Sequence, residues 1–254
     1  MPPMVITGRI PPLFYLLASI MSDYQISAIG HIQSPYKQKF AIPRQPRLVP
    51  EAKAKLIFAP DFNREEFVRG LDEFSHIWLL FRFHETADKG YSAMVRPPRL
   101  GGNERKGVFA TRATFRPNAI GMSAVKLEGI EYKNGQLALL LAGIDLLDGT
   151  PIVDIKPYLP YSDSLPDASA GFADTRPETH MSVEFSKQAL EFINKQSHYP
   201  ELQAFISNVL KQDPRPAYKK QKQGMQSYGM NLYEYNITWQ VTDSHHLVTH
   251  IEPS

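Results

Sequence analysis

The sequence predicts a mainly β protein, in which a compact N-terminal barrel or sandwich is followed by a small α+β domain. Short apolar segments with strand periodicity recur through the first 160 residues. Proline-rich turns separate these segments, as in compact all-β domains. After a polar stretch, two amphipathic helical segments precede two further strand-like segments.

Strand-like segments follow one another closely in the first half of the chain. Residues 24–32 alternate apolar and polar side chains, and residues 76–83 (HIWLLFRF) form the apolar run of a buried strand. Asn134-Gly135 lies between the apolar segments 124–132 and 136–142, which predicts a tight hairpin, because both residues tolerate positive φ. The other strands expected here are 107–112 and 151–156, and the expected helix is 63–74.

The second half has a different organisation. Residues 166–181 are rich in Pro, Asp, Ser and Ala, which predicts a linker between a barrel domain of residues 21–165 and a small domain of residues 182–254. In the small domain we expect one helix over 182–196 and a second from Pro200 onwards. Apolar residues at helical spacing support the second helix: Leu202, Phe205, Ile206, Val209 and Leu210. Strands over 231–242 and 246–251 are expected to form a terminal hairpin.

Composition narrows the possible classes of function. The 254 residues have a formal net charge of only +2, so no global field indicates a polyanionic partner. The chain has no cysteine, which excludes disulfides, thiolate metal sites and cysteine nucleophiles, and fits a cytoplasmic protein. Residues 1–20 include an apolar stretch, Pro11 to Ile20, that is too short to span a bilayer. We interpret residues 1–20 as an upstream start or extension without a function, rather than as a signal peptide.

Motifs for common cofactors are absent. The chain has no G-x-G-x-x-G after a strand, no P-loop, no H-E-x-x-H metal motif and no G-x-S-x-G nucleophile elbow. It has instead several loops that are stiffened by proline and rich in Arg and amide side chains. Together they predict a pocket for a polar, partly anionic small molecule, although each loop alone is also a normal surface turn. These loops are residues 42–46, 75–76, 96–105, 115–118 and 148–151.

Six segments carry a resemblance to a known family: PRQP (43–46), VRGLDEFSHIW (68–78), VRPPRLGG (95–102), GVFATRATFRPNAIGMS (107–123), DGTPIVDIKPYLPY (148–161) and QDPRPAY (212–218). In this order they resemble the TsaA/TrmO family, and the resemblance runs from Tyr24 to Glu252. Members are S-adenosylmethionine-dependent tRNA (adenine-N6)-methyltransferases. The resemblance implies a single-sheeted β-barrel as the N-terminal domain and a small α+β domain at the C-terminus.

The resemblance also implies a substrate, an assembly and a set of cofactor contacts. The methyl group would go to N6 of threonylcarbamoyladenosine beside the anticodon of tRNA, and the protein would be a homodimer without a metal. The family's contacts with S-adenosyl-L-methionine fall on the following positions of this sequence: Pro43, Arg44, Gln45, His76, Ile77, Arg105, Arg116, Leu127, Asp148, Gly149, Thr150 and Pro151.

The identity of the proton acceptor stays open at this point. Methyl transfer from a sulfonium releases a neutral thioether, so alignment and exclusion of water should supply most of the rate. The lone pair on a ureido-substituted N6 is delocalised, so we expect proton removal near the transition state. The candidates are His76, Asp148 and Asp154, with Asp148 favoured for a cofactor contact instead. Lys156 is expected to neutralise a carboxylate of the cofactor or of the threonyl group.

A basic loop towards the C-terminus is expected to hold the RNA, because cations bind phosphates and aromatic rings stack on unpaired bases. A solvated charged face is the simpler alternative. The expected RNA-binding residues are Arg215, Tyr218, Lys219, Lys220 and Lys222, and Arg96, Arg99 and Arg112 would extend this surface. Two other functions remain open: a non-catalytic RNA- or S-adenosylmethionine-binding module, and a methyltransferase with another acceptor.

Overall fold

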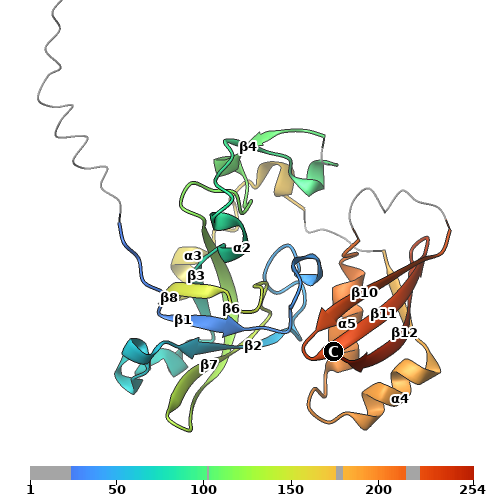
Figure 1. The fold of residues 1–254 in the computed structure, drawn as a ribbon. Helices are drawn as coiled ribbons and strands as arrows, with labels where there is room; N and C mark the ends of the chain where they lie inside the picture. Colours follow the sequence, from blue (N-terminus) through green and yellow to red (C-terminus); the bar gives the residue numbers. More distant parts are fainter. Residues whose placement is uncertain (1–23, 102, 176–179, 216–223) are drawn as a thin grey trace, which may run out of the picture.

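The computed structural model describes residues 24–101, 103–175, 180–215 and 224–254, and six of its strands form a closed ring (Figure 1). The strand order is β1-β2-β7-β6-β3-β8, and β1 is antiparallel to both β2 and β8, which closes the sheet. The mainly β class predicted from the sequence is confirmed. The strands are β1 (Gly30–Gln33), β2 (Lys53–Phe58), β3 (His76–Arg82), β6 (Ile120–Lys133), β7 (Gln136–Ala142) and β8 (Pro151–Pro157).

Alternating side chains fill the inside of the ring. In β2 and β3 every second residue is buried, and Leu56, Ile77 and Leu79 are fully shielded from solvent. Burying one such side chain contributes roughly 1.5–3 kcal/mol. The turn between β6 and β7 has positive φ at Asn134 (53°) and Gly135 (76°), so the predicted hairpin is confirmed.

Four expectations for this half were wrong or incomplete. The segment 63–74 forms two 3-10 turns, η3 (Glu65–Val68) and η4 (Leu71–Glu73), because Gly70 takes a φ of 79° that an α-helix does not allow. Instead of a strand over 107–112, β5 (Lys106–Gly107) is followed by η6 (Val108–Ala110). The first strand starts only at Gly30, and β2 was missed although Ala54, Leu56 and Phe58 alternate with polar residues.

The C-terminal part is a four-stranded sheet in the order β10-β11-β12-β9 with two helices. Its elements are β9 (Ser182–Phe185), α4 (Lys187–Lys195), α5 (Leu202–Lys211), β10 (Gln226–Leu232), β11 (Tyr235–Thr242) and β12 (His245–Pro253). The five apolar residues expected on the second helix are all buried. The helix expected over 182–196 begins instead as β9, and Ser186 caps α4 by accepting the N–H of Ala189. The strand expected over 231–242 is interrupted at Tyr233, whose φ is 54°.

Short elements complete the described chain: η1 (Lys39–Ala41), η2 (Pro60–Phe62), α2 (His84–Ala87), β4 (Met94–Val95), η5 (Pro98–Leu100), α3 (Pro160–Asp163) and η7 (Gly171–Ala173). β4 and β5 form a two-stranded ladder outside the ring. Within the residues described, no helix has both the length and the apolar character needed to cross a membrane.

The segment after β1 packs against the C-terminal sheet. Tyr36 forms an isolated bridge with Leu232, and its ring centroid lies 5.9 Å from that of Phe205 in α5. The N–H of Tyr233 donates to the carbonyl of Pro35 at 2.8 Å. Figure 1 shows this segment between the ring and the C-terminal sheet. Since the same segment continues into Pro43-Arg44-Gln45, the C-terminal part fixes the start of a predicted cofactor loop.

Candidate cofactor site

Two of the predicted cofactor loops, residues 42–46 and 148–151, lie in longer segments, 34–47 and 143–151, that are held together as one unit. The carboxylate of Asp148 accepts the backbone N–H of Ser34 at 2.8 Å and the ammonium of Lys37 at 2.7 Å. The hydroxyl of Ser34 donates to the carbonyl of Leu146 at 2.7 Å. Further along, the N–H of Arg47 donates to the carbonyl of Gly143 at 2.8 Å. Contacts at both ends therefore fix where Pro43-Arg44-Gln45 lies relative to Asp148-Gly-Thr-Pro151.

A third loop, residues 107–119, contains the predicted loop 115–118 and joins this unit through Arg112. The guanidinium of Arg112 donates to the side-chain oxygen of Gln45 at 2.6 Å. The guanidinium of Arg116 donates to the carbonyls of Thr111 at 2.7 Å and Val108 at 3.2 Å, inside its own loop. Arg116 therefore shapes the loop, and Arg112 connects that loop to the first cofactor segment.

His76 stands at the start of β3, opposite Lys126 of β6. Its Nδ1 lies 3.0 Å from the hydroxyl of Ser75, and its ring meets that of Tyr158 edge-on. Partial burial lowers the pKa of His76 below its usual 6.5, and the positive charges of Arg47 and Lys126 lower it further. The imidazole is therefore neutral at pH 7. The influence of Arg47 also indicates that the 34–47 loop lies near the start of β3.

Of the remaining predicted contacts, three have buried side chains and one is exposed. Ile77 and Leu127 point into the barrel core, so only their backbones are available to a ligand. Thr150 is buried, with its hydroxyl donating to the carbonyl of Leu147 at 2.6 Å. Arg105 is exposed in the segment before β5 and, within the described chain, has no hydrogen bond or ion pair with the other predicted positions. Geometry therefore gathers residues 43–45, 76, 112–116 and 148–151, and leaves Arg105 outside.

Comparison with known protein families identifies the family of this chain. The N-terminal domain model of tRNA-methyltransferase O matches residues 31–164, and the TrmO C-terminal domain model matches residues 178–254. The chain belongs to the tRNA-methyltransferase O (TrmO) family.

Individual relatives of the family cover nearly the whole chain. The tRNA (adenine(37)-N6)-methyltransferase of Escherichia coli K12 is 50% identical over 234 residues, which are 92% of this chain and 100% of that protein. A putative S-adenosylmethionine-dependent methyltransferase RcsF of Pseudomonas aeruginosa is 47% identical and covers 85% of this chain and 92% of its own length. The crystal structure of TrmO from Pseudomonas aeruginosa superposes with a TM-score of 0.74 at 39% identity, covering 91% of this chain and 99% of that one.

Within this TrmO chain, reasoning from sequence missed Asp145 and Lys37. Asp145 lies between β7 and β8, and its Oδ1 is shielded from solvent with no hydrogen-bond partner among the described residues. Burial raises the pKa of Asp145 to about 6, against the opposing effects of Ser123, its own backbone and Arg112. Its place three residues before Asp148 was the one available signal. Lys37 gave none, because its partner is distant along the chain.

The other two acidic or basic candidates lie apart from the loop unit. Asp154 accepts the N–H of Ile155 at 2.9 Å and borders a mostly apolar cleft of about 420 Å³ whose other walls include Phe58, Phe67 and Leu71. Lys156 is exposed on β8 opposite Trp78. Among the described residues there is no group of three or more side chains suited to a metal ion.

The structure corrects the prediction for one of the RNA-binding residues, Arg215. Arg215 is buried, and its guanidinium pairs with Asp213 at 2.7 Å, so this cation is not presented at the surface as expected. Tyr218, Lys219, Lys220 and Lys222 lie outside the described residues. Arg99 is used internally, donating to the carbonyls of Ala173 and Thr175, and Arg112 is used by Gln45. Arg96 remains exposed.

Proposed function

We propose that this protein transfers a methyl group from S-adenosylmethionine to N6 of adenosine 37 in tRNA. The observation that carries the proposal is the 50% identity to the E. coli tRNA (adenine(37)-N6)-methyltransferase over that protein's full length. The resemblance to the family adds that the acceptor already bears a threonylcarbamoyl group. A tRNA substrate would place the protein in the cytoplasm.

The cofactor is proposed to lie against residues 43–45, His76 and the backbone of 148–151. The charge of this unit supports the proposal. Lys37 already neutralises Asp148, whereas Arg44 and Arg47 form no ion pair among the described residues. A guanidinium without a partner suits the carboxylate of the methionyl group. The N–H groups of Gly149 and Thr150 donate to the carbonyls of Ile32 and Leu147, so the carbonyls of Asp148 and Gly149 are the backbone groups proposed to accept from the ribose or adenine. Arg105 would contribute only if a second subunit brings it to the loops.

Bound S-adenosylmethionine supplies a methyl group on a sulfonium whose leaving group is a neutral thioether. The chain must then remove the N6 proton and keep water out. Among the three candidates for proton acceptor, the structure favours His76. Both oxygens of Asp148 already accept hydrogen bonds, and Asp154 lies at the separate apolar cleft. His76 is neutral at pH 7, and no described residue occupies its Nε2.

We also propose a separate function for each of the two domains. The single-sheeted barrel of residues 21–165 would carry out methyl transfer, residues 166–181 would link, and residues 182–254 would bind tRNA. The boundaries of the two family models, 31–164 and 178–254, support this division. In it, Tyr218, Lys219, Lys220 and Lys222 keep their proposed contact with RNA phosphates and bases.

A homodimer is the proposed assembly. Large apolar side chains are exposed near the third loop, among them Phe109 at 78% and Met122 at 53% of their surface. Neighbouring Met94 and Phe115 are exposed as well. A patch of this kind on a single subunit favours burial against a partner. Sedimentation of wild type and of Met122→Glu tests this proposal, because the variant should sediment as a monomer while wild type does not.

The function is tested by incubating the protein with methyl-labelled S-adenosylmethionine and two preparations of one tRNA, with and without the threonylcarbamoyl group. Digestion and mass analysis of the nucleosides should show one added methyl group at the modified adenosine only. Binding of cofactor and tRNA without any methylated nucleoside would favour the non-catalytic module. Methylation at a different nucleoside would favour another acceptor.

A further inference from the structure

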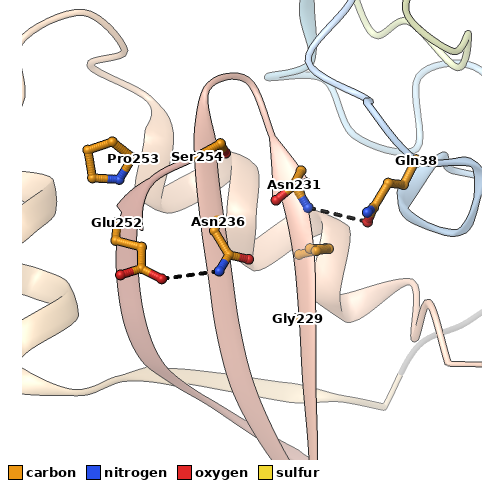
Figure 2. A pocket seen from close by; sticks show the side chains of 8 residues that line it. Gln38, Gly229, Asn231, Asn236, Glu252, Pro253 and Ser254 are labelled. Carbon is orange, nitrogen blue, oxygen red and sulfur yellow. Dashed lines mark hydrogen bonds between the residues drawn. The ribbon is translucent and has the colours of Figure 1, made fainter.

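A groove lies where the C-terminal sheet meets the segment after β1. It has a volume of about 550 Å³ and is lined by Gln38, Gly229, Asn231, Asn236, Glu252 and Pro253, among others (Figure 2). Asn231 pairs with Asn236 across β10 and β11, and Asn236 pairs with Glu252 across β11 and β12. The three polar side chains therefore form a row across three strands, on the face opposite the buried Met230, Ile237 and Ile251.

The lining of the groove suits the edge of a nucleobase better than a phosphate. The described residues that line it supply three side-chain amides, the carboxylate of Glu252 and the hydroxyl of Ser254, and include no lysine or arginine. Amides both donate to and accept from base edges, and a carboxylate accepts from exocyclic amino groups. Glu252 accepts from Asn236 at 3.2 Å, with His250 3.3 Å from its other oxygen. Each oxygen of an ionised carboxylate can accept more than one hydrogen bond, so Glu252 keeps acceptor capacity for a base.

The floor of the groove is kept flat by Gly229. This glycine lies inside β10, and its φ is not in the left-handed region, so the backbone does not require glycine there. Of the described atoms, the nearest to a Cβ added at Gly229 would be Asn236 Oδ1 at 3.7 Å, which is an ordinary contact. Glycine inside a strand weakens it and often marks the close approach of a ligand. Its missing side chain leaves room for a flat ring.

The position of the groove connects it to the cofactor site. Gln38 accepts the N–H of Asn231 at 3.4 Å and lies five residues before Pro43. The neighbouring backbone bond between Tyr233 and Pro35 holds the two walls together. The groove and the cofactor site therefore share the 34–47 segment, and the anticodon loop that carries the acceptor adenosine is the single-stranded RNA to test in the groove.

We propose that this groove binds one unpaired base of the tRNA substrate, with Glu252 accepting from an exocyclic amino group on that base. This inference rests on the proposed tRNA methyltransferase function and adds the element that selects among tRNAs. The pocket would read a nucleotide other than the one that is methylated.

The first test fills the groove. Gly229→Val should weaken tRNA binding and raise KM for tRNA about tenfold or more, with the Kd for S-adenosylmethionine unchanged. Thr238→Val is the matched control, because Thr238 faces Gly229 across the strands but does not line the groove. Gly229→Ala, which adds only one methyl group, should give a smaller increase and serves if the valine variant does not fold. Unfolding temperatures of all variants are compared with that of wild type.

The second test identifies the base that the groove binds. Each single-stranded guanosine of the anticodon loop is replaced by inosine, and each cytidine by uridine, which removes the exocyclic amino group. One replacement should reduce wild-type kcat/KM about tenfold and should cost nothing further in Glu252→Gln, because both changes remove the same hydrogen bond. Unchanged tRNA binding in Gly229→Val, or equal losses in Thr238→Val, would overturn the inference while methylation by wild type stands. If wild type methylates no tRNA, the proposed function fails instead, and equilibrium tRNA binding still decides whether the groove is occupied.

Discussion

The carboxylate of Asp148 bridges Lys37 and Ser34, accepting the lysine ammonium at 2.7 Å and the backbone N–H of the serine at 2.8 Å. Sequence comparison suggested that Asp148 contacts the cofactor. In the structure its side chain has a structural role instead, because it joins two loops that are more than one hundred residues apart in the sequence. The cofactor would therefore meet the backbone that follows Asp148 rather than its carboxylate.

Replacing Asp148 should lower the free energy of unfolding more than replacing its cationic partner, Lys37. Lys37→Met loses a partly exposed ion pair, which is worth on the order of 0.5 kcal/mol. Asp148→Ala also leaves the Ser34 N–H unpaired, so we expect about 1–2 kcal/mol of destabilisation and weaker cofactor binding. Urea unfolding and calorimetric titration with S-adenosylmethionine measure both effects. Asp88→Ala, which breaks the exposed pair with Arg82, is the control and should change neither. Equal losses in Lys37→Met and Asp148→Ala would contradict the bridging role.

The pH dependence of methyl transfer should report His76. Burial, Arg47 and Lys126 lower the pKa of this imidazole below 6.5, so protonation inactivates it only in mildly acidic solution. We expect kcat/KM to be flat near pH 7 and to fall as the pH drops through that lowered pKa. His76→Gln should lose this acidic limb together with about 10²-fold in kcat. Asp154→Asn should keep both the limb and the rate. If His76→Gln retains the limb, another group takes the proton.

Much of the fold was predictable from local pattern, because β3, the β6–β7 hairpin and α5 each have the periodicity of a half-buried element. The failures occurred where one residue ends a pattern without a visible signal. Tyr233 turns the chain with a positive φ although it is neither glycine nor asparagine, and two strands therefore looked like one. Residues 182–185 alternate polar and apolar side chains as a strand does, but this four-residue segment was joined to the helical pattern that follows it, and its pairing with β12 shows that it is a strand.

The site was predictable to a smaller extent. Proline-stiffened motifs indicated which loops matter, but not what each side chain does inside them. Arg116 belongs to one of the sequence motifs, and it donates to carbonyls of its own loop. Asp145 belongs to no motif, although it lies close enough to Arg112 of the third loop for that charge to affect its pKa. Such roles depend on contacts between distant segments, which periodicity does not encode.

Arg116 should be required for the shape of the third loop rather than for its charge. Its guanidinium reaches two carbonyls at once and lies over the ring of Phe109, with 5.9 Å from Cζ to the ring centroid. Both bonds come from one terminal nitrogen, and lysine lacks the flat guanidinium that lies over Phe109, so Arg116→Lys should weaken S-adenosylmethionine binding nearly as much as Arg116→Met. Both variants should also increase hydrogen exchange at the amides of residues 108–116. Arg96→Lys, at an exposed position, serves as the control. Full recovery of binding in Arg116→Lys would show that charge alone suffices.

Asp145 should reduce stability at neutral pH. Its pKa is about 6 in the folded protein against 3.8 in the unfolded chain, because burial disfavours the carboxylate. At low pH both states hold the proton and there is no penalty. As the pH rises from about 4 to 6 the unfolded chain releases its proton first, so folding becomes less favourable, and above pH 6 the penalty stays constant. Replacing the carboxyl with a neutral amide removes this dependence.

Asp145→Asn should therefore gain about 2 kcal/mol relative to wild type between pH 4.5 and pH 7.5, when the free energies of unfolding in urea are compared at both values. Asp163→Asn provides a control of opposite sign. The backbone N–H of Leu159, followed by the indole of Trp78, lowers the pKa of Asp163, so its contribution to stability is present at neutral pH and lost in acid. That variant should lose stability relative to wild type as the pH rises. A pH-independent difference for Asp145→Asn would mean that water or a cation reaches Oδ1 in solution, and that the carboxylate is charged and satisfied at the junction of the three loops.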